Sequence, residues 1–312
     1  MRHAEPALVD AGAPFTFAAA LGEGLTRREL ESVQFVRVFH GVYVSRAVTR
    51  TLLVRTRAAL LVAPRSAVVS HHTAAQLYGG YVPASSSIHL SMKAPLNCKQ
   101  AGIRPHRVQR PPTAAAWRGV PITSPERTFC DLGGALDLVE LVVLGDRLVR
   151  RGRTTPERLR AAADSWDGSH ARVLRRAAGL VRVGVDSRPE TQLRMLMVLA
   201  GLPEPEVDIR FDNPQTGDLE RRLDTGYRDL RLGIEYDGAQ HREDEEVYEA
   251  DITRHEEIRE KRRWRLMRVT RKGVYDVPLA TLLRIDDARV DRGARPTVFR
   301  DEWQAYFPGK GI

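Results

Sequence analysis

The chain has 312 residues, 42% hydrophobic and 29% charged, which suits two domains of about 100–200 residues and excludes global disorder. Its 49 Lys and Arg against 40 Asp and Glu give a formal net charge of +9. The two cysteines, Cys98 and Cys130, offer neither a disulfide framework nor a paired zinc site, and residues 135–144, the longest apolar stretch, include two acids. We therefore expect a soluble cytoplasmic protein without a signal peptide or membrane-spanning segment.

The basic charge is unevenly distributed along the chain. Residues 1–160 hold 22 basic and 11 acidic side chains, whereas residues 161–312 hold 27 and 29. Residues 32–125 contain 12 Lys or Arg and no Asp or Glu. A basic surface without a partner is one explanation, but so long an acid-free stretch favours a polyanion, with nucleic acid ahead of a membrane surface.

Residues 14–45 show the element order of a winged helix-turn-helix. In that module the second helix enters the DNA major groove and the hairpin wing lies on phosphates. The predicted elements are a helix over 14–21, a helix beginning at the capping box of Thr26 and Glu29, and a hairpin of strands 36–39 and 42–45.

Five residues of this segment are candidate nucleic-acid contacts, because they lie on the second helix or the hairpin. Alternatively, the segment is a small structural cap whose arginines are only solvated. The acid-free surroundings favour DNA contact by Thr26, Arg27, Arg28, Arg37 and His40.

A mixed region of helices and short strands follows over residues 51–160. Adjacent His71 and His72 fall on a predicted helix over 70–79, where neighbouring side chains point about 100° apart. Because no third ligand lies at metal spacing in the sequence, capping or core packing is favoured over metal binding. The other predicted elements are a helix over 51–62, strands at 87–92, 103–109 and 119–122, and a helix over 124–130.

Four segments of the first half occur in the order of a known family. They are residues 24–30 (GLTRREL), 38–44 (VFHGVYV), 70–77 (SHHTAAQL) and 119–128 (GVPITSPERT). Through them, roughly residues 10–165 resemble the AbiEi-type antitoxin and transcriptional-regulator family. The resemblance implies a winged-helix DNA-binding head and an α/β subdomain, which that family uses to regulate its own operon and counter a toxin. It does not by itself imply a toxin partner for this chain.

Glu190 is the first candidate catalytic residue of the C-terminal half. A helix is predicted to begin at Ser187, and Glu190 shares the apolar stripe of Leu193 and Met197. A carboxylate on a buried face indicates a site, but Ser187 and Glu190 also fit a helix-capping box. Both interpretations stay open.

Two predicted strands, 223–227 and 230–236, carry further acids. If residues 228 and 229 form a symmetric two-residue turn, Asp224 pairs with Gly233, whose missing side chain leaves room. Asp224 and Glu235 then become diagonal neighbours about 7–8 Å apart at Cα, a span that one divalent cation can bridge. An odd-length loop would instead move Asp224 away.

Asp224, Glu235 and Asp237 then share one face of the strand pair. Three acids on one face repel one another unless a metal or protons neutralise them. Mg²⁺ or Mn²⁺ held by carboxylates lowers the pKa of a bound water and stabilises charge on a phosphate, as phosphodiester hydrolysis requires. The alternative is an ordinary exposed acidic strand face.

The segment 235–241 (EYDGAQH), which follows a hydrophobic strand, resembles the Vsr-like branch of the PD-(D/E)XK nuclease superfamily. The resemblance runs from about residue 187 to 269. It implies that Asp224 and Glu235 are metal ligands, that Glu190 supports the site, and that His241 contacts phosphate or water. Asp237 stands where the superfamily has lysine, so the general base is unassigned. His241 is the first candidate, and an ordinary loop histidine is the alternative.

These observations predict an α/β (α+β) protein that binds double-stranded DNA and carries a Mg²⁺-dependent endonuclease domain, a restriction-endonuclease-like mixed sheet flanked by helices. The alternative is a non-catalytic AbiEi-like regulator or antitoxin whose nuclease-like domain serves dimerisation or partner binding, with a homodimer and a toxin as candidate partners. RNA in place of DNA is a further alternative. The expected parts are a winged helix-turn-helix over 1–50, an α/β subdomain over 51–165, a helical connector over 166–186 and the nuclease domain over 187–312.

Overall fold

The computed structural model describes residues 12–93, 100–109, 112–212, 216, 219–238 and 263–310, which form a mixed α/β structure with three sheets. The chain divides into two compact units. The first unit comprises Met1–Leu136 and Glu157–Arg175, and the second comprises Asp137–Pro156 and Arg176–Ile312. The predicted connector, 166–186, is thus shared between the two units.

A three-stranded antiparallel sheet of order β1-β3-β2 begins the first unit. The predicted helix over 14–21 is wrong at its start, because Phe15 and Thr16 form a strand that pairs with β3. Phe15 is buried there, with its ring edge-on to Phe35 at 5.6 Å. The elements are β1 (Phe15–Thr16), α1 (Phe17–Gly22), α2 (Arg27–Leu30), β2 (Phe35–Phe39) and β3 (Val42–Ser45).

The predicted capping box of α2 is confirmed. Thr26 N donates to Glu29 Oε2 at 2.7 Å, and Glu29 N donates to Thr26 Oγ1 at 3.3 Å. Both bonds satisfy amides that a helix start leaves unpaired, which allows a helix of only 4 residues to form here. The predicted hairpin at His40 and Gly41 is confirmed as well, since β2 and β3 pair antiparallel on either side of these residues.

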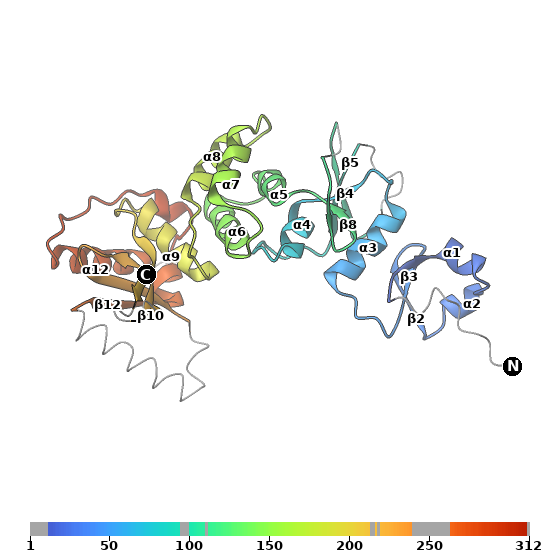
Figure 1. Ribbon diagram of the computed structural model, residues 1–312, viewed down its shortest axis with the longest axis horizontal. Coiled ribbons are helices and arrows are strands. Elements are labelled where there is room, and N and C mark those ends of the chain that lie inside the picture. The colour runs from blue at the N-terminus through green and yellow to red at the C-terminus, as the bar shows by residue number, and fades with distance from the viewer. Residues whose placement is uncertain are drawn as a thin grey trace. The chain divides into compact units, whose positions relative to one another are not determined.

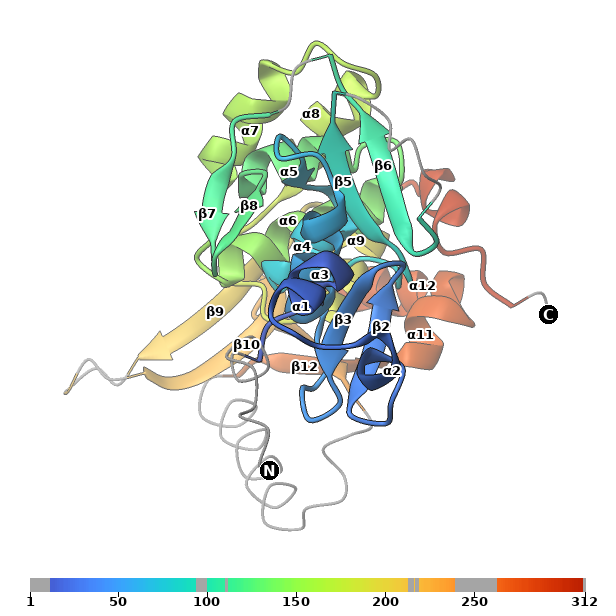
Figure 2. The same ribbon diagram turned by 90° about the vertical axis from the view of Figure 1, so that its right-hand side faces the viewer.

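A five-stranded mixed sheet of order β6-β5-β4-β8-β7 forms the rest of the first unit, and Figure 2 shows β7, β8, β5 and β6 in that order across it. The strands are β4 (Val68–Val69), β5 (Ile88–Met92), β6 (Ile103–Arg107), β7 (Ala115–Trp117) and β8 (Val120–Ile122). The helices are α3 (Leu52–Val62), α4 (His71–Leu77), α5 (Pro125–Asp131), α7 (Pro156–Asp164) and α8 (Ala171–Leu180), which crosses the unit boundary.

The second unit is built on a four-stranded sheet of order β12-β11-β10-β9, in which β12 runs parallel to β11 and the other neighbours are antiparallel. Helix α9 packs on β10 and β11 (Figure 1). None of the helices in the described residues is long and apolar enough to span a bilayer. The elements are α6 (Leu138–Arg150), α9 (Arg188–Leu199), β9 (Glu206–Asp212), β10 (Leu219–Tyr227), β11 (Leu232–Asp237), β12 (Arg265–Thr270), α11 (Arg271–Tyr275), α12 (Pro278–Val290) and a 3₁₀ helix (Glu302–Ala305).

The predicted two-residue turn between β10 and β11 is wrong. Residues 228–231 connect the strands, and the amide of Arg231, whose φ is 48°, donates to the carbonyl of Arg228 at 3.0 Å. Strand β11 therefore begins two residues later than expected, at Leu232. Gly233 is paired with Gly226 and not with Asp224.

The two facing glycines fix this register. A Cβ on Gly226 would lie 2.2 Å from the carbonyl oxygen of Leu232, so only glycine fits there. A Cβ on Gly233 would lie 2.7 Å from Leu223 Cδ1 and 2.8 Å from Leu266 Cδ2. The space at Gly233 is therefore filled by two leucine side chains, which corrects the expectation that it leaves room for a metal.

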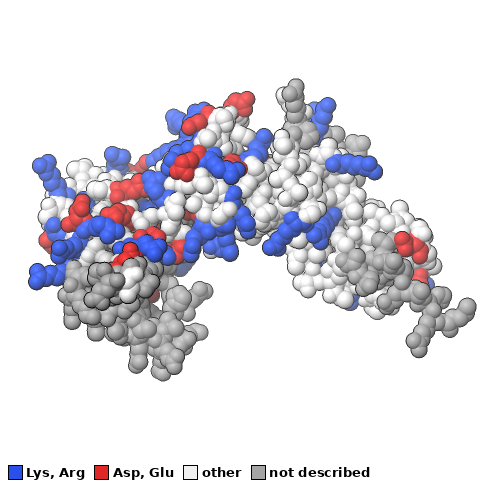
Figure 3. All heavy atoms as spheres, in the orientation of Figure 1, with Lys and Arg blue, Asp and Glu red and all other residues white. Residues whose placement is uncertain are grey.

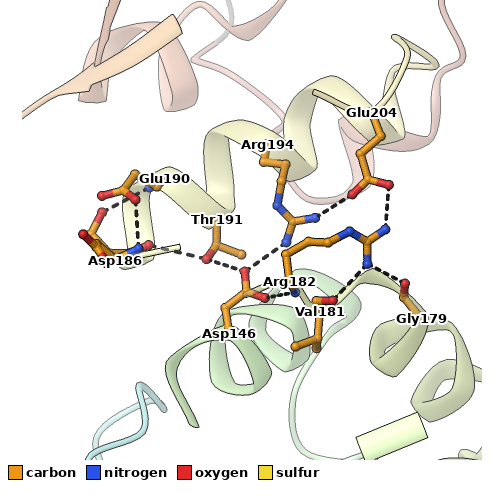
Figure 4. Close-up of polar contacts among 10 residues, drawn as sticks. Asp146, Gly179, Val181, Arg182, Asp186, Glu190, Thr191, Arg194 and Glu204 are labelled. Carbon is orange, nitrogen blue, oxygen red and sulfur yellow. Dashed lines mark hydrogen bonds and ion pairs between the residues drawn. The ribbon is translucent and has the colours of Figure 1, made fainter. Parts of the chain in front are cut away.

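A buried ion pair attaches α9 to α6 (Figure 4). Arg194 Nη2 lies 2.9 Å from Asp146 Oδ2, and the two side chains are 1% and 2% exposed. Asp146 also accepts hydrogen bonds from Thr191 Oγ1 at 2.9 Å and from the amide of Arg182 at 2.8 Å. Burial raises the pKa of Asp146, and the positive charge of Arg194 opposes that shift. The pair fixes which face of α9 is turned toward α6.

Replacing Arg194 tests this attachment. In Arg194→Met, Asp146 is left buried without its cation, so we expect the free energy of unfolding in urea to fall by about 3–5 kcal/mol. The control is Arg188→Met on the exposed surface of the same helix, with a change within about 0.5 kcal/mol. Equal stability of the two variants would show that the ion pair is not needed.

Candidate functional site

Glu190 lies in the N-terminal turn of α9, and its carboxylate takes part in capping (Figure 4). Glu190 Oε2 accepts a hydrogen bond from the amide of Asp186 at 2.9 Å, and Glu190 N donates to Ser187 Oγ at 3.3 Å. The side chain is half-buried. Only one half of the expected capping box is therefore present: Ser187 caps the amide of Glu190, whereas the Glu190 carboxylate bonds to the amide of Asp186.

Asp224 and Glu235 lie on the neighbouring strands β10 and β11. Each is one residue beyond Thr225 and Ile234, the last paired residues of the two strands. The amide of Tyr236 donates to Asp224 Oδ2 at 3.1 Å, so the Asp224 carboxylate lies against β11. Glu235 is only 9% exposed.

A third acid, Asp208 on β9, flanks Asp224 on its other side. The pairing of β9 with β10 places Leu223 opposite Ile209 and Thr225 opposite Val207, so Asp208 falls opposite Asp224. Asp208 has a left-handed φ of 53° and lies 2.7 Å from Arg222 Nε. We did not predict this strand from the sequence, although the apolar residues at 207, 209 and 211 alternate as in a half-buried strand.

Of the two remaining predicted catalytic residues, the structure describes Asp237 but not His241. Asp237 is the last residue of β11, where it pairs with Thr270 of β12. His241 lies outside the described residues. Among the residues that the structure does describe, no group of three or more His, Cys, Asp or Glu side chains is arranged to hold a metal ion. Mg²⁺ is commonly held by one or two carboxylates together with waters and substrate phosphate, so the pair Asp224 and Glu235 still fits its chemistry.

The predicted nucleic-acid contacts lie on α2 and on the hairpin of β2 and β3, and all five are exposed. The hydroxyl of Thr26 belongs to the capping box, and Arg27 Nε lies 3.2 Å from Glu31 Oε1. These two side chains therefore already have local structural roles. Arg28, Arg37 and His40 are the more accessible candidates for contact with a ligand.

The acid-free stretch shows basic side chains at the surface. In the view of Figure 3, blue Lys and Arg atoms but no red acidic atoms lie over the region of α3, β4 and β5, whereas both signs mix over the second unit. A surface of one sign attracts a polyanion through long-range electrostatics. The exposed basic residues described within this stretch are Arg37, Arg46, Arg50, Arg65, Lys93, Arg104, Arg107 and Arg118.

A cluster of four histidines in the first unit was missed by the sequence analysis, which considered only His71 and His72. His89 of β5 and His106 of β6 join them. His89 Nδ1 and His106 Nε2 are 3.0 Å apart, and the rings of His71 and His106 stack with centroids 3.4 Å apart. His71 Nδ1 lies 2.9 Å from Ser70 Oγ, and Ser70, the N-cap of α4, makes no side-chain cap bond. Of the two expected roles for His71, packing is therefore seen and capping is not.

Burial keeps these imidazoles neutral. Desolvation, with the neighbouring histidines, lowers the pKa of His71 to about 2. Desolvation also lowers the pKa of His72, and it lowers those of His89 and His106 to about 4, helped by the positive charge of Arg104. At neutral pH the cluster therefore presents lone pairs and N–H groups without a net charge.

No protein-family model matches the chain, and no curated protein matches it either.

Because of the histidine cluster, we expect the folded protein to lose stability in mild acid. Unfolded histidines take up protons near pH 6.5, whereas folded His89 and His106 resist protonation until about pH 4. The free energy of unfolding should therefore fall as the pH drops from 6.5 toward 4, by up to about 1.4 kcal/mol per pH unit for each such histidine.

Urea titrations at pH 7, 6 and 5 measure this slope. His89→Gln should flatten it, and His40→Gln, at an exposed turn, should leave it unchanged. If His89→Gln retains the full slope of the unmodified protein, the cluster is not its origin.

Proposed function

We propose that the protein binds double-stranded DNA and hydrolyses its phosphodiester bonds in a reaction that depends on Mg²⁺ or Mn²⁺. The observation that carries this proposal is the placement of Asp224 and Glu235 on neighbouring strands, each one residue beyond the paired Thr225 and Ile234, with the Asp224 carboxylate held against β11 by the amide of Tyr236. Two oxygen-donor side chains on neighbouring strands of a protein with a net charge of +9 suit a divalent cation and a phosphate.

The order of elements supports a nuclease domain of the Vsr-like PD-(D/E)XK kind in the second unit. The resemblance implies a helix carrying Glu190, a strand carrying Asp224, a strand carrying Glu235 and a closing strand. In the second unit these elements are α9, β10, β11 and β12, and the three strands are consecutive neighbours in one sheet. The capping bond of Glu190 to Asp186 gives this acid a positioning role at the start of α9.

The chemistry proposed for each residue follows from its type. Asp224 and Glu235 would hold the metal, which when bound lowers the pKa of a coordinated water and stabilises charge on the phosphate. Asp237 cannot orient the water and stabilise the leaving charge as the usual lysine does, and His241 is the proposed general base. Arg268 is an exposed residue of β12 that pairs with Glu235 of β11. Its positive charge would attract the phosphate backbone of DNA.

For the first unit we propose a winged helix-turn-helix that holds the DNA. Two helices followed by an antiparallel hairpin, with Arg28 on α2 and Arg37 and His40 at the hairpin, support this assignment. In such a module the second helix reads the major groove while the hairpin contacts phosphates. The acid-free surface of the same unit would add sequence-independent affinity.

A second candidate function is a non-catalytic DNA-binding regulator or antitoxin of the AbiEi type. The observations that favour it are the capping role of the Glu190 carboxylate and the aspartate at position 237 in place of lysine. Such a protein would bind an operator with a steep salt dependence and would cut no DNA with any metal. Its second unit would then serve dimerisation or contact with a toxin.

Cleavage of plasmid DNA separates the two functions. With Mg²⁺ or Mn²⁺ the unmodified protein should nick or cut, and Asp224→Asn and Glu235→Gln should each lower the rate at least about 100-fold, because each removes a charged ligand. Asp224→Asn retains an oxygen that can accept from Tyr236 N, so the strand pairing is preserved. Asp212→Asn, an exposed acid on β9, is the matched control. Undiminished cutting by both site variants would overturn the assignment, and no cutting by the unmodified protein would favour the regulator.

DNA affinity tests the first unit separately. Arg28→Ala and Arg37→Ala should each weaken binding to duplex DNA and reduce the slope of log affinity against log salt by about one, if each contacts one phosphate. Arg160→Ala, at a partly exposed arginine of α7, should leave both quantities unchanged. Fluorescence anisotropy at several salt concentrations measures them, and an unaltered slope in both variants would remove α2 and the hairpin from the interface.

A further inference from the structure

The outer edge of the five-stranded sheet carries a group of exposed basic side chains. Strand β6 is the terminal strand in the order of this sheet, beside β5 (Figure 2). Its residues Arg104, Pro105 and Arg107 are exposed, and Lys93, which directly follows β5, is exposed too. We call Lys93, Arg104 and Arg107 the basic edge.

The pairing of β5 with β6 brings two of these cations to the same end of the sheet. The register aligns Met92 with Arg107, and the amide of Val108 donates to the carbonyl of Met92 at 3.1 Å. Lys93 and Arg107 therefore lie side by side where the two parallel strands end. Together with Val108 and Gln109 they line a hollow of about 500 Å³, and none of these four lining residues is acidic.

The side chains of the basic edge form no ion pair with the residues that the structure describes. Arginines of the second unit are different, since Arg182 lies 2.6 Å from Glu204 Oε2 and Arg265 lies 2.7 Å from Asp291 Oδ2. Cations gathered without counter-charges produce a positive potential that attracts anions. The basic edge is thus free to pair with an anionic ligand.

The composition of this edge selects among possible partners. A β-strand added from another protein would need the backbone N–H groups of β6, but Pro105 has none, and charged side chains at an edge oppose such pairing. Single-stranded nucleic acid stacks its bases on aromatic side chains, and neither β6 nor the described lining of the hollow contains Phe, Tyr or Trp. The phosphate backbone of a duplex needs only cations and hydrogen-bond donors, which Lys93, Arg107 and Gln109 supply.

Arg104 extends the same surface along the strand. Side chains alternate along a strand, so Arg104 and Arg107, three residues apart, point to opposite faces of β6. Their backbone positions are separated by about 10 Å at about 3.3 Å per residue. A duplex that lies along this edge therefore meets a cation on each side of the strand.

We propose that the basic edge binds the phosphate backbone of double-stranded DNA without reading its sequence. It is a second contact surface of the first unit, made of other residues than the candidates Arg28 and Arg37 on α2 and the hairpin. The proposal rests on the proposed binding of DNA by this protein, but not on cleavage. Each cation that meets a phosphate releases counterions, so the edge adds affinity for any sequence and makes binding more sensitive to salt.

DNA affinity of the full-length double variant Arg104→Gln with Arg107→Gln tests this surface. We expect the slope of log affinity against log salt to fall by about two, because each phosphate contact contributes about 0.9. The loss of affinity should be at least about tenfold and equal for two duplexes of unrelated sequence, since phosphates carry no sequence information. Lys93→Gln alone should lower the slope by about one. Fluorescence anisotropy at several salt concentrations measures these quantities, and circular dichroism checks that the variants fold.

The double variant Arg172→Gln with Arg175→Gln is the matched control. It removes two exposed arginines of α8 from the same unit, and the slope should be unchanged. An unaltered slope in the folded edge variant would overturn the inference, and so would an equal decrease in the control, which would make net charge the cause. Loss of affinity for single strands but not for duplexes would overturn it as well.

The outcome for α2 and the hairpin is independent of this result. If the edge variant weakens binding and Arg28→Ala and Arg37→Ala do not, the basic edge is supported and the winged-helix interface fails. If only Arg28→Ala and Arg37→Ala weaken binding, the proposed function stands and the basic edge is refuted. Absence of duplex binding by the unmodified protein would overturn both.

Discussion

The second unit depends on one buried carboxylate. Asp146, 2% exposed, lies on α6 and is reached by Arg194 and Thr191 of α9 and by the backbone of Arg182. A buried charge is tolerated only when its partners are correctly placed, so α9 can take few orientations against α6. Because α9 also packs on β10 and β11, this constraint reaches the strands that carry Asp224 and Glu235.

A second constraint lies within the sheet itself. Gly226 and Gly233 face each other, and the carbonyl of Leu232 leaves no room for a Cβ at Gly226. The register that follows differs by two residues from the symmetric hairpin expected from the sequence. Because side chains alternate with a period of two, a shift of two residues preserves the faces and alters only the partners. The shift pairs Gly233 with Gly226 and no longer with Asp224.

The elements with strong local signals could be predicted from the sequence. The capping box of Thr26 and Glu29, the hairpin at His40 and Gly41, and the start of α9 at Ser187 all depend on neighbouring residues. Two elements were missed or misread because distant partners determine them: Phe15 and Thr16 form a strand only by pairing with β3, and β9 is stabilised by β10.

In the candidate sites, too, the residue types could be predicted from the sequence, whereas their distances depend on distant parts of the chain. The acids at 224 and 235 could be recognised on their strands, but their distance depends on a loop of four residues whose conformation requires a left-handed Arg231. The strands holding His89 and His106 were predicted, yet nothing local indicates that β5 and β6 are parallel neighbours. Residue type and periodicity identify the donors, whereas strand order decides which donors meet.

The two donor sets differ in a way that separates their chemistry. Asp224 and Glu235 are oxygen donors that carry charge when ionised, and they suit a hard divalent cation that also attracts phosphate. The histidine cluster offers neutral nitrogen donors in the unit whose residues 32–125 lack any acid. A polyanion attracted to that basic surface would meet no acidic side chain from this stretch. The neutral imidazoles therefore leave the basic side chains to set the charge of the first unit, whereas Asp224 and Glu235 place two acids on neighbouring strands of the second.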